Sequence, residues 1–78
     1  MSPQQNYSDF KEKDMSELHK EIILTYISCY MNISKTAKAL HLHRNTVTYH
    51  LYKIREVTGL DPFNFHDLVK LMKLAEEI

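Results

Sequence analysis

A cluster of polar side chains between residues 43 and 52 carries hydrogen-bonding groups that suit the edges of nucleic acid bases. Arginine pairs bidentately with guanine O6 and N7, asparagine pairs with adenine N6 and N7, and the threonine methyl group contacts that of thymine. The residues that could do this chemistry are His43, Arg44, Asn45, Thr48, Tyr49 and Tyr52. We predict that they contact bases in the major groove of duplex DNA.

A second group of side chains nearby suits the phosphate backbone, because hydroxyl and ammonium groups donate to phosphate oxygens. Its members are Ser34, Lys35, Thr36, Lys38, Thr46 and Lys53. Tyr49 is an alternative phosphate contact. Four of the members lie at the expected start of a helix, whose free N–H groups also attract anions.

The charge of the 78-residue chain is zero overall but unevenly distributed. Residues 32–55 hold five of the ten basic residues, three of the five histidines and no acidic residue. A phosphate backbone responds to the local electrostatic field. This basic segment, flanked on both sides by acidic residues, therefore favours nucleic acid as the partner.

The elements that must position these groups are predicted to be four helices, at about residues 15–31, 35–40, 44–58 and 65–77. The chain has only one Gly and two Pro, the residues that most strongly favour turns, and this favours an all-α domain. Asp14 or Ser16 is the expected cap of the first helix, and Ser34 that of the second. The inward arc of the first helix is predicted to hold Leu18, Ile22, Tyr26, Cys29 and Tyr30, with Ile23 at its edge.

The spacing of apolar residues from 37 to 51 is typical of a helix-turn-helix, with two unequal helices joined by three residues. The apolar positions are Ala37, Leu40, Leu42, Val47 and Leu51. His41 stands where such a turn often needs a left-handed residue, and His is among the few side chains enriched there. Gly59 is the expected left-handed residue after the third helix.

Apolar residues cover well over half of the circumference of the fourth helix. A single stripe that faces the core needs only about 100° of that circumference. The excess predicts a second buried surface, against either a homodimer partner or a neighbouring sensor domain. Residues 1–14 are expected to be a flexible segment, and residues 15–78 the helix-turn-helix domain.

The segment SKTAKALHLHRNTVTYHLYKIREVTGLD, residues 34–61, resembles the C-terminal helix-turn-helix of the PucR and CdaR transcription regulators. With the flanking helices, the similarity covers about residues 18–78, and the turn and third helix also look like those of Fis-type activators. The resemblance implies DNA binding, bacterial transcription control and action as a dimer. It also implies Arg44, Asn45, Thr46 and Tyr49 as DNA contacts.

Competing functions have less support in the sequence. His41, His43 and His50 lie close together, but without a nearby Cys, acidic ligand or H-x₃-H pair we expect no metal. With no Gly-rich loop or nucleophile set, we expect no enzyme activity, no cofactor and no small-molecule site. The absence of an 18-residue apolar run and of several cysteines favours a cytoplasmic protein with no membrane partner. The remaining alternative is a protein-interaction or dimerisation module of the same fold that has lost DNA binding.

Overall fold

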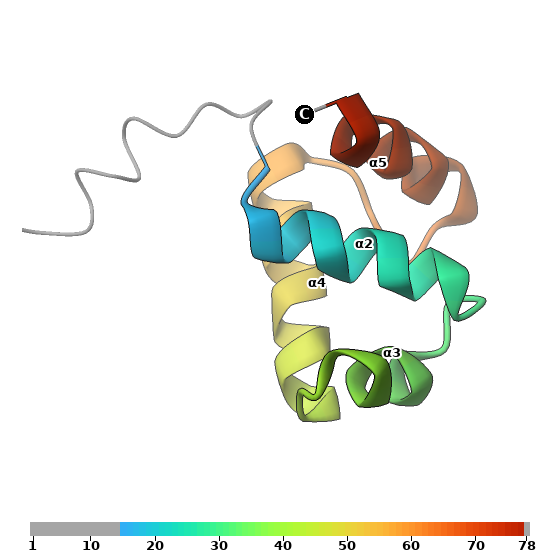
Figure 1. Cartoon of the computed structure of the whole chain (residues 1–78). Helices are drawn as coiled ribbons and strands as arrows, with labels where there is room; N and C mark the ends of the chain where they lie inside the picture. Colours follow the sequence, from blue (N-terminus) through green and yellow to red (C-terminus); the bar gives the residue numbers. More distant parts are fainter. Residues whose placement is uncertain (1–14, 78) are drawn as a thin grey trace, which may run out of the picture.

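The computed structural model describes residues 15–77, and these form four α-helices with no strand. The helices are α2 (Glu17–Ser28), α3 (Ile33–Leu40), α4 (Arg44–Thr58) and α5 (Phe65–Glu77) (Figure 1). The predicted all-α fold with a helix-turn-helix is therefore confirmed. The segment predicted to be flexible, residues 1–14, lies outside the described residues, as does the proposed capping by Asp14.

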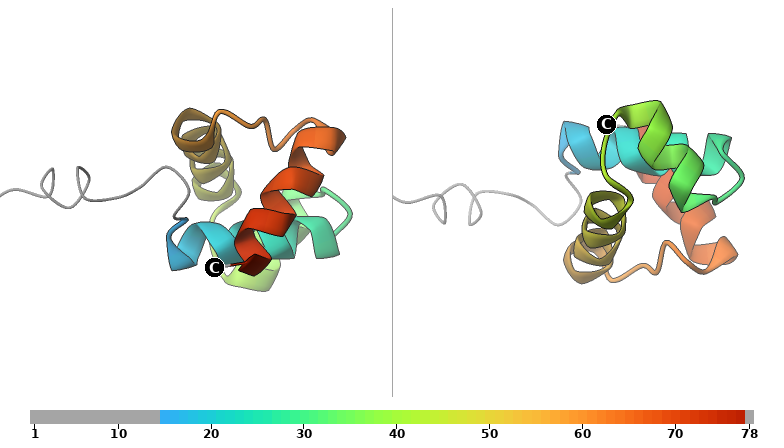
Figure 2. Two further views of the ribbon diagram at one scale, coloured as in Figure 1. Left: turned by 90° about the horizontal axis from the view of Figure 1, so that it is seen from above. Right: turned by 90° about the horizontal axis from the view of Figure 1, so that it is seen from below.

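Helix α2 is the centre of the packing, because it lies against each of the other three helices. Helix α3 packs against α2 and α4, whereas α5 is close to α2 alone among the described helices. The views from above and below show α4 and α5 apart, with the connector running between them (Figure 2). The core holds apolar side chains from all four helices: Ile22, Ile23, Tyr26, Ala37, Val47, Leu51, Ile54, Leu68, Leu71 and Ala75, together with Met15.

The first helix is shorter than predicted at its C-terminal end. Ser16 caps its start, with Oγ accepting from the backbone N–H of His19 at 3.1 Å. The helix ends at Ser28 because Tyr30 and Met31 adopt positive φ angles of 57° and 62°, which no α-helix continues. The predicted inward arc is therefore wrong at Tyr30, which is 90% exposed.

Other positions on the arc of α2 also differ from the prediction. Leu18 is exposed and Cys29 is half-buried, whereas Ile23 is fully buried and not at the edge of the arc. Ending the helix at Ser28 removes Cys29 and Tyr30 from the helical face that the sequence period assigned to them.

The second helix begins two residues earlier than predicted, and its N-cap is Asn32. The Asn32 Oδ1 atom accepts from the Lys35 N–H at 2.8 Å, which satisfies one free donor of the first turn. Asn is as favourable an N-cap as Ser, so the sequence offered two caps and Ser34 was the wrong one. Ser34 instead lies inside the first turn of α3.

The connector between α4 and α5 is fixed at both ends. Gly59 has the predicted left-handed conformation, with φ 78° and ψ 0°. At the start of α5, Asn64 Oδ1 accepts from the Asp67 N–H at 3.1 Å. The Asp67 carboxylate accepts from the Asp61 N–H at 3.0 Å, so Asp67 also ties down the connector.

Candidate nucleic-acid interface

The turn between α3 and α4 sets the angle at which α4 leaves the domain. His41 is left-handed, with φ 59° and ψ 41°, as predicted. The next residue, Leu42, donates its N–H to the Ala37 carbonyl at 2.9 Å and packs against the core. Ala37 is itself buried, and its small side chain leaves room for the helix crossing. Helix α4 is thereby held against α3 with its first turns projecting from the domain (Figure 1).

The buried stripe of α4 decides which of its side chains are available to a ligand. Val47, Leu51 and Ile54 recur at i, i+4 and i+7 and are almost completely buried, as predicted. Side chains a quarter-turn or more from this stripe point outwards. Arg44 and Asn45 are exposed and Thr48 is half-exposed, so these three of the six predicted base-contacting side chains are accessible in the first turns of α4.

The N-terminal end of α4 is capped by a histidine and leaves two reading side chains free. His43 Nδ1 accepts from the Asn45 N–H at 3.0 Å, and the Thr48 hydroxyl donates to the Arg44 carbonyl at 3.1 Å. Within residues 15–77, the side chains of Arg44 and Asn45 have no hydrogen-bond or ion-pair partner. Their donors and acceptors are therefore available to a base edge.

One member of the predicted phosphate set is in the wrong place for that role. Thr36 is fully buried, and its hydroxyl donates to the Asn32 carbonyl at 2.8 Å inside α3. The prediction for Thr36 is therefore wrong, because a buried and already bonded hydroxyl does not reach phosphate. Ser34, Lys35 and Lys38 are exposed around the same helix, so they are accessible.

The other two members of the set lie on α4. Thr46 is half-buried in its first turn. Lys53 lies about two and a half turns from the start of the helix, with Nζ 3.7 Å from the Glu56 carboxylate. Because one carboxylate already lies beside it, Lys53 offers less free charge to a phosphate than Lys35 or Lys38.

The two tyrosines of α4 have different surroundings. Tyr49 is 57% exposed and its ring meets the edge of the His50 ring. Tyr52 is about half-exposed, and its ring centroid lies 5.3 Å from that of Phe63 in the connector. The Arg55 guanidinium carbon lies 5.3 Å from the centre of the Tyr52 ring, within range of a cation–π contact. Tyr52 is thus part of a cluster with Phe63 and Arg55 in the second half of α4.

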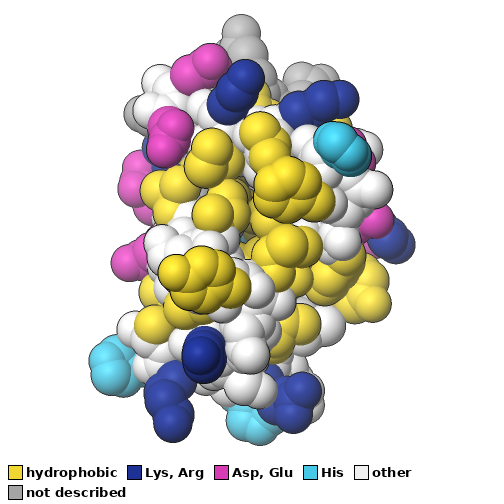
Figure 3. All heavy atoms as spheres, turned by 90° about the vertical axis from the view of Figure 1, so that its right-hand side faces the viewer, with side chains coloured by type: hydrophobic (Ala, Val, Ile, Leu, Met, Phe, Trp, Pro, Cys, Tyr) yellow, Lys and Arg dark blue, Asp and Glu magenta, His cyan; other side chains and the backbone are white. Residues whose placement is uncertain are grey.

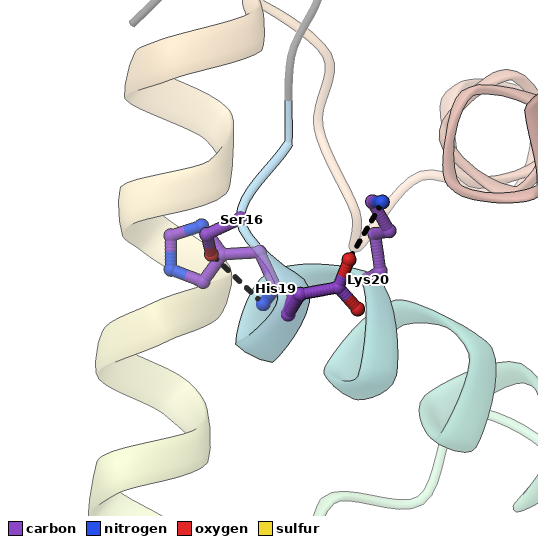
Figure 4. A network of polar contacts seen from close by, with 4 residues as sticks. Ser16, His19 and Lys20 are labelled. Atoms are coloured by element: carbon purple, nitrogen blue, oxygen red, sulfur yellow. Dashed lines mark hydrogen bonds and ion pairs between the residues drawn. The ribbon is translucent and has the colours of Figure 1, made fainter. Parts of the chain in front are cut away.

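A histidine pair joins α2 to α4 behind the exposed face. His19 Nε2 and His50 Nδ1 are 3.2 Å apart, and Figure 4 shows the His19 ring directed at α4 from the helix turn that Ser16 caps. Burial lowers the pKa of His19, and the nearby His50 and Lys53 lower it further. The pair therefore favours a neutral His19.

This pair was not found by sequence reasoning, which grouped His41, His43 and His50. The structure separates these three, because His43 caps α4 and His50 faces α2. A contact across 31 residues has no local signal in the sequence. Within the part of the chain that the structure describes, no three His, Cys, Asp or Glu residues converge on a metal-sized site.

Comparison with known proteins identifies this arrangement. The sequence profile of the PucR C-terminal helix-turn-helix domain matches residues 20–73, which include α3, the turn and α4. The chain belongs to this family. Its family consists of domains of transcription regulators and not of enzymes, so the predicted resemblance and the expected lack of enzyme activity are both confirmed.

Two curated regulators contain segments similar to this PucR-type domain. The purine catabolism regulatory protein of Bacillus subtilis (strain 168) is 40% identical over 55 residues, which are 70% of this chain and 10% of that protein. The carbohydrate diacid regulator of Escherichia coli (strain K12) is 51% identical over 45 residues, 54% of this chain and 12% of that protein. An uncharacterised B. subtilis protein is 48% identical over 46 residues, which are 59% of this chain and 15% of that protein.

The PucR-type domain thus spans a small part of each relative's length. No solved structure matches the chain. None of the helices in residues 15–77 has the length and apolar character needed to cross a bilayer.

Proposed function

We propose that this PucR-type domain binds double-stranded DNA in a sequence-specific manner, with the first turns of α4 in the major groove. The observation that carries the proposal is the outer face of α4. There, Arg44 and Asn45 are exposed beside half-exposed Thr48, and neither has a side-chain partner among residues 15–77, while Val47, Leu51 and Ile54 fix the helix to the core. A recognition helix needs this combination, in which the helix is packed rigidly against the core and its base-contacting groups are free.

Within the proposed interface, His43, Arg44, Asn45, Thr48 and Tyr49 contact bases. Tyr52 is the outermost of the proposed base contacts, because it lies further along α4 and its ring packs against that of Phe63. Ser34, Lys35, Lys38, Thr46 and Lys53 anchor phosphates on either side. The supporting observation is that these groups belong to a stretch of chain, residues 32–55, that carries no acidic residue.

We further propose that the domain regulates transcription in the cytoplasm as part of a two-fold dimer or beside a sensor domain. One small DNA-binding domain provides limited affinity, whereas two such domains bind half-sites about 34 Å apart, or a multiple of that distance. Two of the three curated relatives are named as regulators, which supports this role.

The test is a titration of ¹⁵N-labelled chain with a mixed-sequence duplex of about two helical turns, followed by backbone amide NMR. Shifts should cluster at residues 34–38 and 43–53. With about four or five phosphates neutralised, the slope of log affinity against log salt should be near −4. If no amide shifts at low salt, the domain does not bind duplex DNA.

The alternative is a domain that keeps the fold, has lost DNA binding and presents α5 to a protein. An exposed apolar groove beside α5, described below, favours it. Under this alternative Arg44→Ala leaves regulation intact in the full regulator. The DNA proposal requires Arg44→Ala to abolish or weaken regulation.

A further inference from the structure

An apolar groove of about 500 Å³ lies between the C-terminal end of α2 and the first turns of α5. Its walls carry Ile27, Tyr30 and Met31 on one side and Phe65, Leu68, Val69 and Met72 on the other. Figure 3 shows hydrophobic side chains gathered across the middle of this face, with Lys and Arg above and below them. The predicted second apolar surface of the fourth helix therefore exists and is open to solvent.

The α5 wall of the groove has the spacing of a helix-pairing seam. Phe65, Val69 and Met72 recur at i, i+4 and i+7, and none of them belongs to the buried core. Alternating steps of three and four residues keep such a stripe facing a partner helix. Leu68, beside the seam, is buried and ties α5 to α2, so the seam is mounted on a fixed helix.

The other wall is shaped by a strained turn that holds an aromatic ring in solvent. Tyr30 and Met31 are consecutive residues with positive φ, a conformation that costs a non-glycine residue about 1–2 kcal/mol. Tyr30 is 90% exposed, and Phe65 across the groove is 64% exposed. Aromatic residues and methionine are the types enriched at protein interfaces.

The charges of α5 indicate which partner fits this groove. Its C-terminal turn carries Glu76 and Glu77 and no basic residue. Carboxylates there oppose the helix dipole, which is negative at this end. The compensating charge is the positive N-terminal end of another helix, and α5 itself begins with such an end. Its first turn carries exposed His66 and the acidic Asp67, whose carboxylate already accepts from the Asp61 N–H of the same chain. An antiparallel pair of α5 helices places each acidic end beside the partner's N-terminal end.

We propose that the groove seats α5 of a second copy of this chain, in a two-fold pair whose α5 helices run antiparallel. The interface is isologous, because the same apolar seam supplies both surfaces. Among the described helices α5 lies against α2 alone, so pairing here leaves the outer face of α4 free on both copies. The proposal rests on the two-fold dimer of the proposed function and assigns its surface.

The test is sedimentation velocity of the full chain without DNA, across a wide range of protein concentration. A reversible dimer is expected, and Val69→Asp should weaken it about tenfold or more, because pairing would bury the new charge. The matched control is Leu24→Asp, which places the same charge on an exposed apolar residue of α2 outside the groove. It should leave the dimer constant unchanged. Phe65→Ser is a second groove variant that removes an exposed ring without opening the core.

A charge variant separates pairing from helix stability. Replacing both Glu76 and Glu77 with Lys favours the helix dipole and should raise the melting temperature of the monomer. The same variant should weaken the dimer several-fold, and added salt should reduce that loss. A strict monomer at every concentration would overturn the proposal, as would a dimer that survives Val69→Asp in a folded variant. Because no DNA is present, either result leaves the DNA-binding proposal intact.

Discussion

The two halves of α4 are covalently continuous but have opposite relations to the rest of the domain. In the first half, Arg44 and Asn45 extend into solvent without a partner among residues 15–77. In the second half, the Tyr52 ring packs against the Phe63 ring at a tilt, Lys53 lies beside Glu56, and the Thr58 hydroxyl donates to the Ile54 carbonyl at 2.7 Å. Val47 and Leu51 are buried in the first half as Ile54 is in the second, so the core holds the whole helix and the two halves differ in their exposed side chains. We call the half with the unpaired side chains the reading half, after its proposed role, and the half with the paired side chains the anchored half.

The strongest test of the anchored half is Ile54→Ala. Ile54 is fully buried between α4 and the rest of the core, so the substitution should lower the free energy of unfolding by about 2–5 kcal/mol in urea denaturation. Ile54→Val is the control and should cost about 0.5–1.5 kcal/mol. DNA affinity of the folded protein should not change. A loss as small for Ala as for Val would show that this half is not the anchor.

Arg44→Ala tests the reading half, and it should lower DNA affinity while leaving stability nearly unchanged. It should cost about 1–3 kcal/mol of binding at one base position, measured by fluorescence anisotropy on a selected site and on its single-base variants. Stability should change by less than about 0.5 kcal/mol, since the side chain is exposed. Lys73→Ala, an exposed cation on α5, is the control and should leave affinity unchanged. Equal losses from the two variants would mean that the reading half has no special role.

Gly59→Ala tests the end of the anchored half. The φ of +78° disfavours any L side chain, so the substitution should lower the free energy of unfolding by about 1 kcal/mol. An added Cβ would have no atom within 4 Å, so the loss comes from the backbone conformation and not from a clash. Gly59→Asn should cost less, because Asn tolerates the left-handed region. Thermal unfolding measures both, and equal stability of Ala and Gly would contradict the stated cause.

The His19–His50 contact lies between the two halves and should give the smallest effect, visible as a pH dependence. The pKa of His19 is lowered in the folded state below its ordinary value of 6.5, so the unfolded chain binds more protons as the pH falls below that value. The free energy of unfolding should therefore decrease on acidification through this range. His19→Gln should flatten the dependence, whereas His66→Gln, at an exposed site, should not. An unchanged pH profile in His19→Gln would contradict this account.

The sequence predicted the anchored helix well because its signals are local. The 3.6-residue period of Val47, Leu51 and Ile54, the glycine at position 59 and the histidine at position 41 each determine one structural feature by themselves. The apolar spacing predicted the helix-turn-helix, and the family resemblance added the expectation of transcription regulation.

The errors have a shared physical cause, which is competition between local alternatives. Asn32 and Ser34 are both good caps, and only the packing of α3 against α2 and α4 selects Asn32. The Thr36 hydroxyl could have faced solvent, but it bonds the Asn32 carbonyl one turn back. The left-handed conformation of Tyr30 and Met31 could not be predicted, because neither residue is a glycine. Long-range contacts such as that between His19 and His50 carry no local signal at all.

The attachment of α5 through α2 alone has a consequence for how the domain opens. A helix held by one neighbour detaches with less loss of contact than one that lies between two others. In the isolated chain, the backbone amides of α5 should therefore exchange with deuterated solvent before those of α2 and α4. That order of exchange would indicate two cooperative units, with α5 opening before the three helices that include the proposed recognition helix.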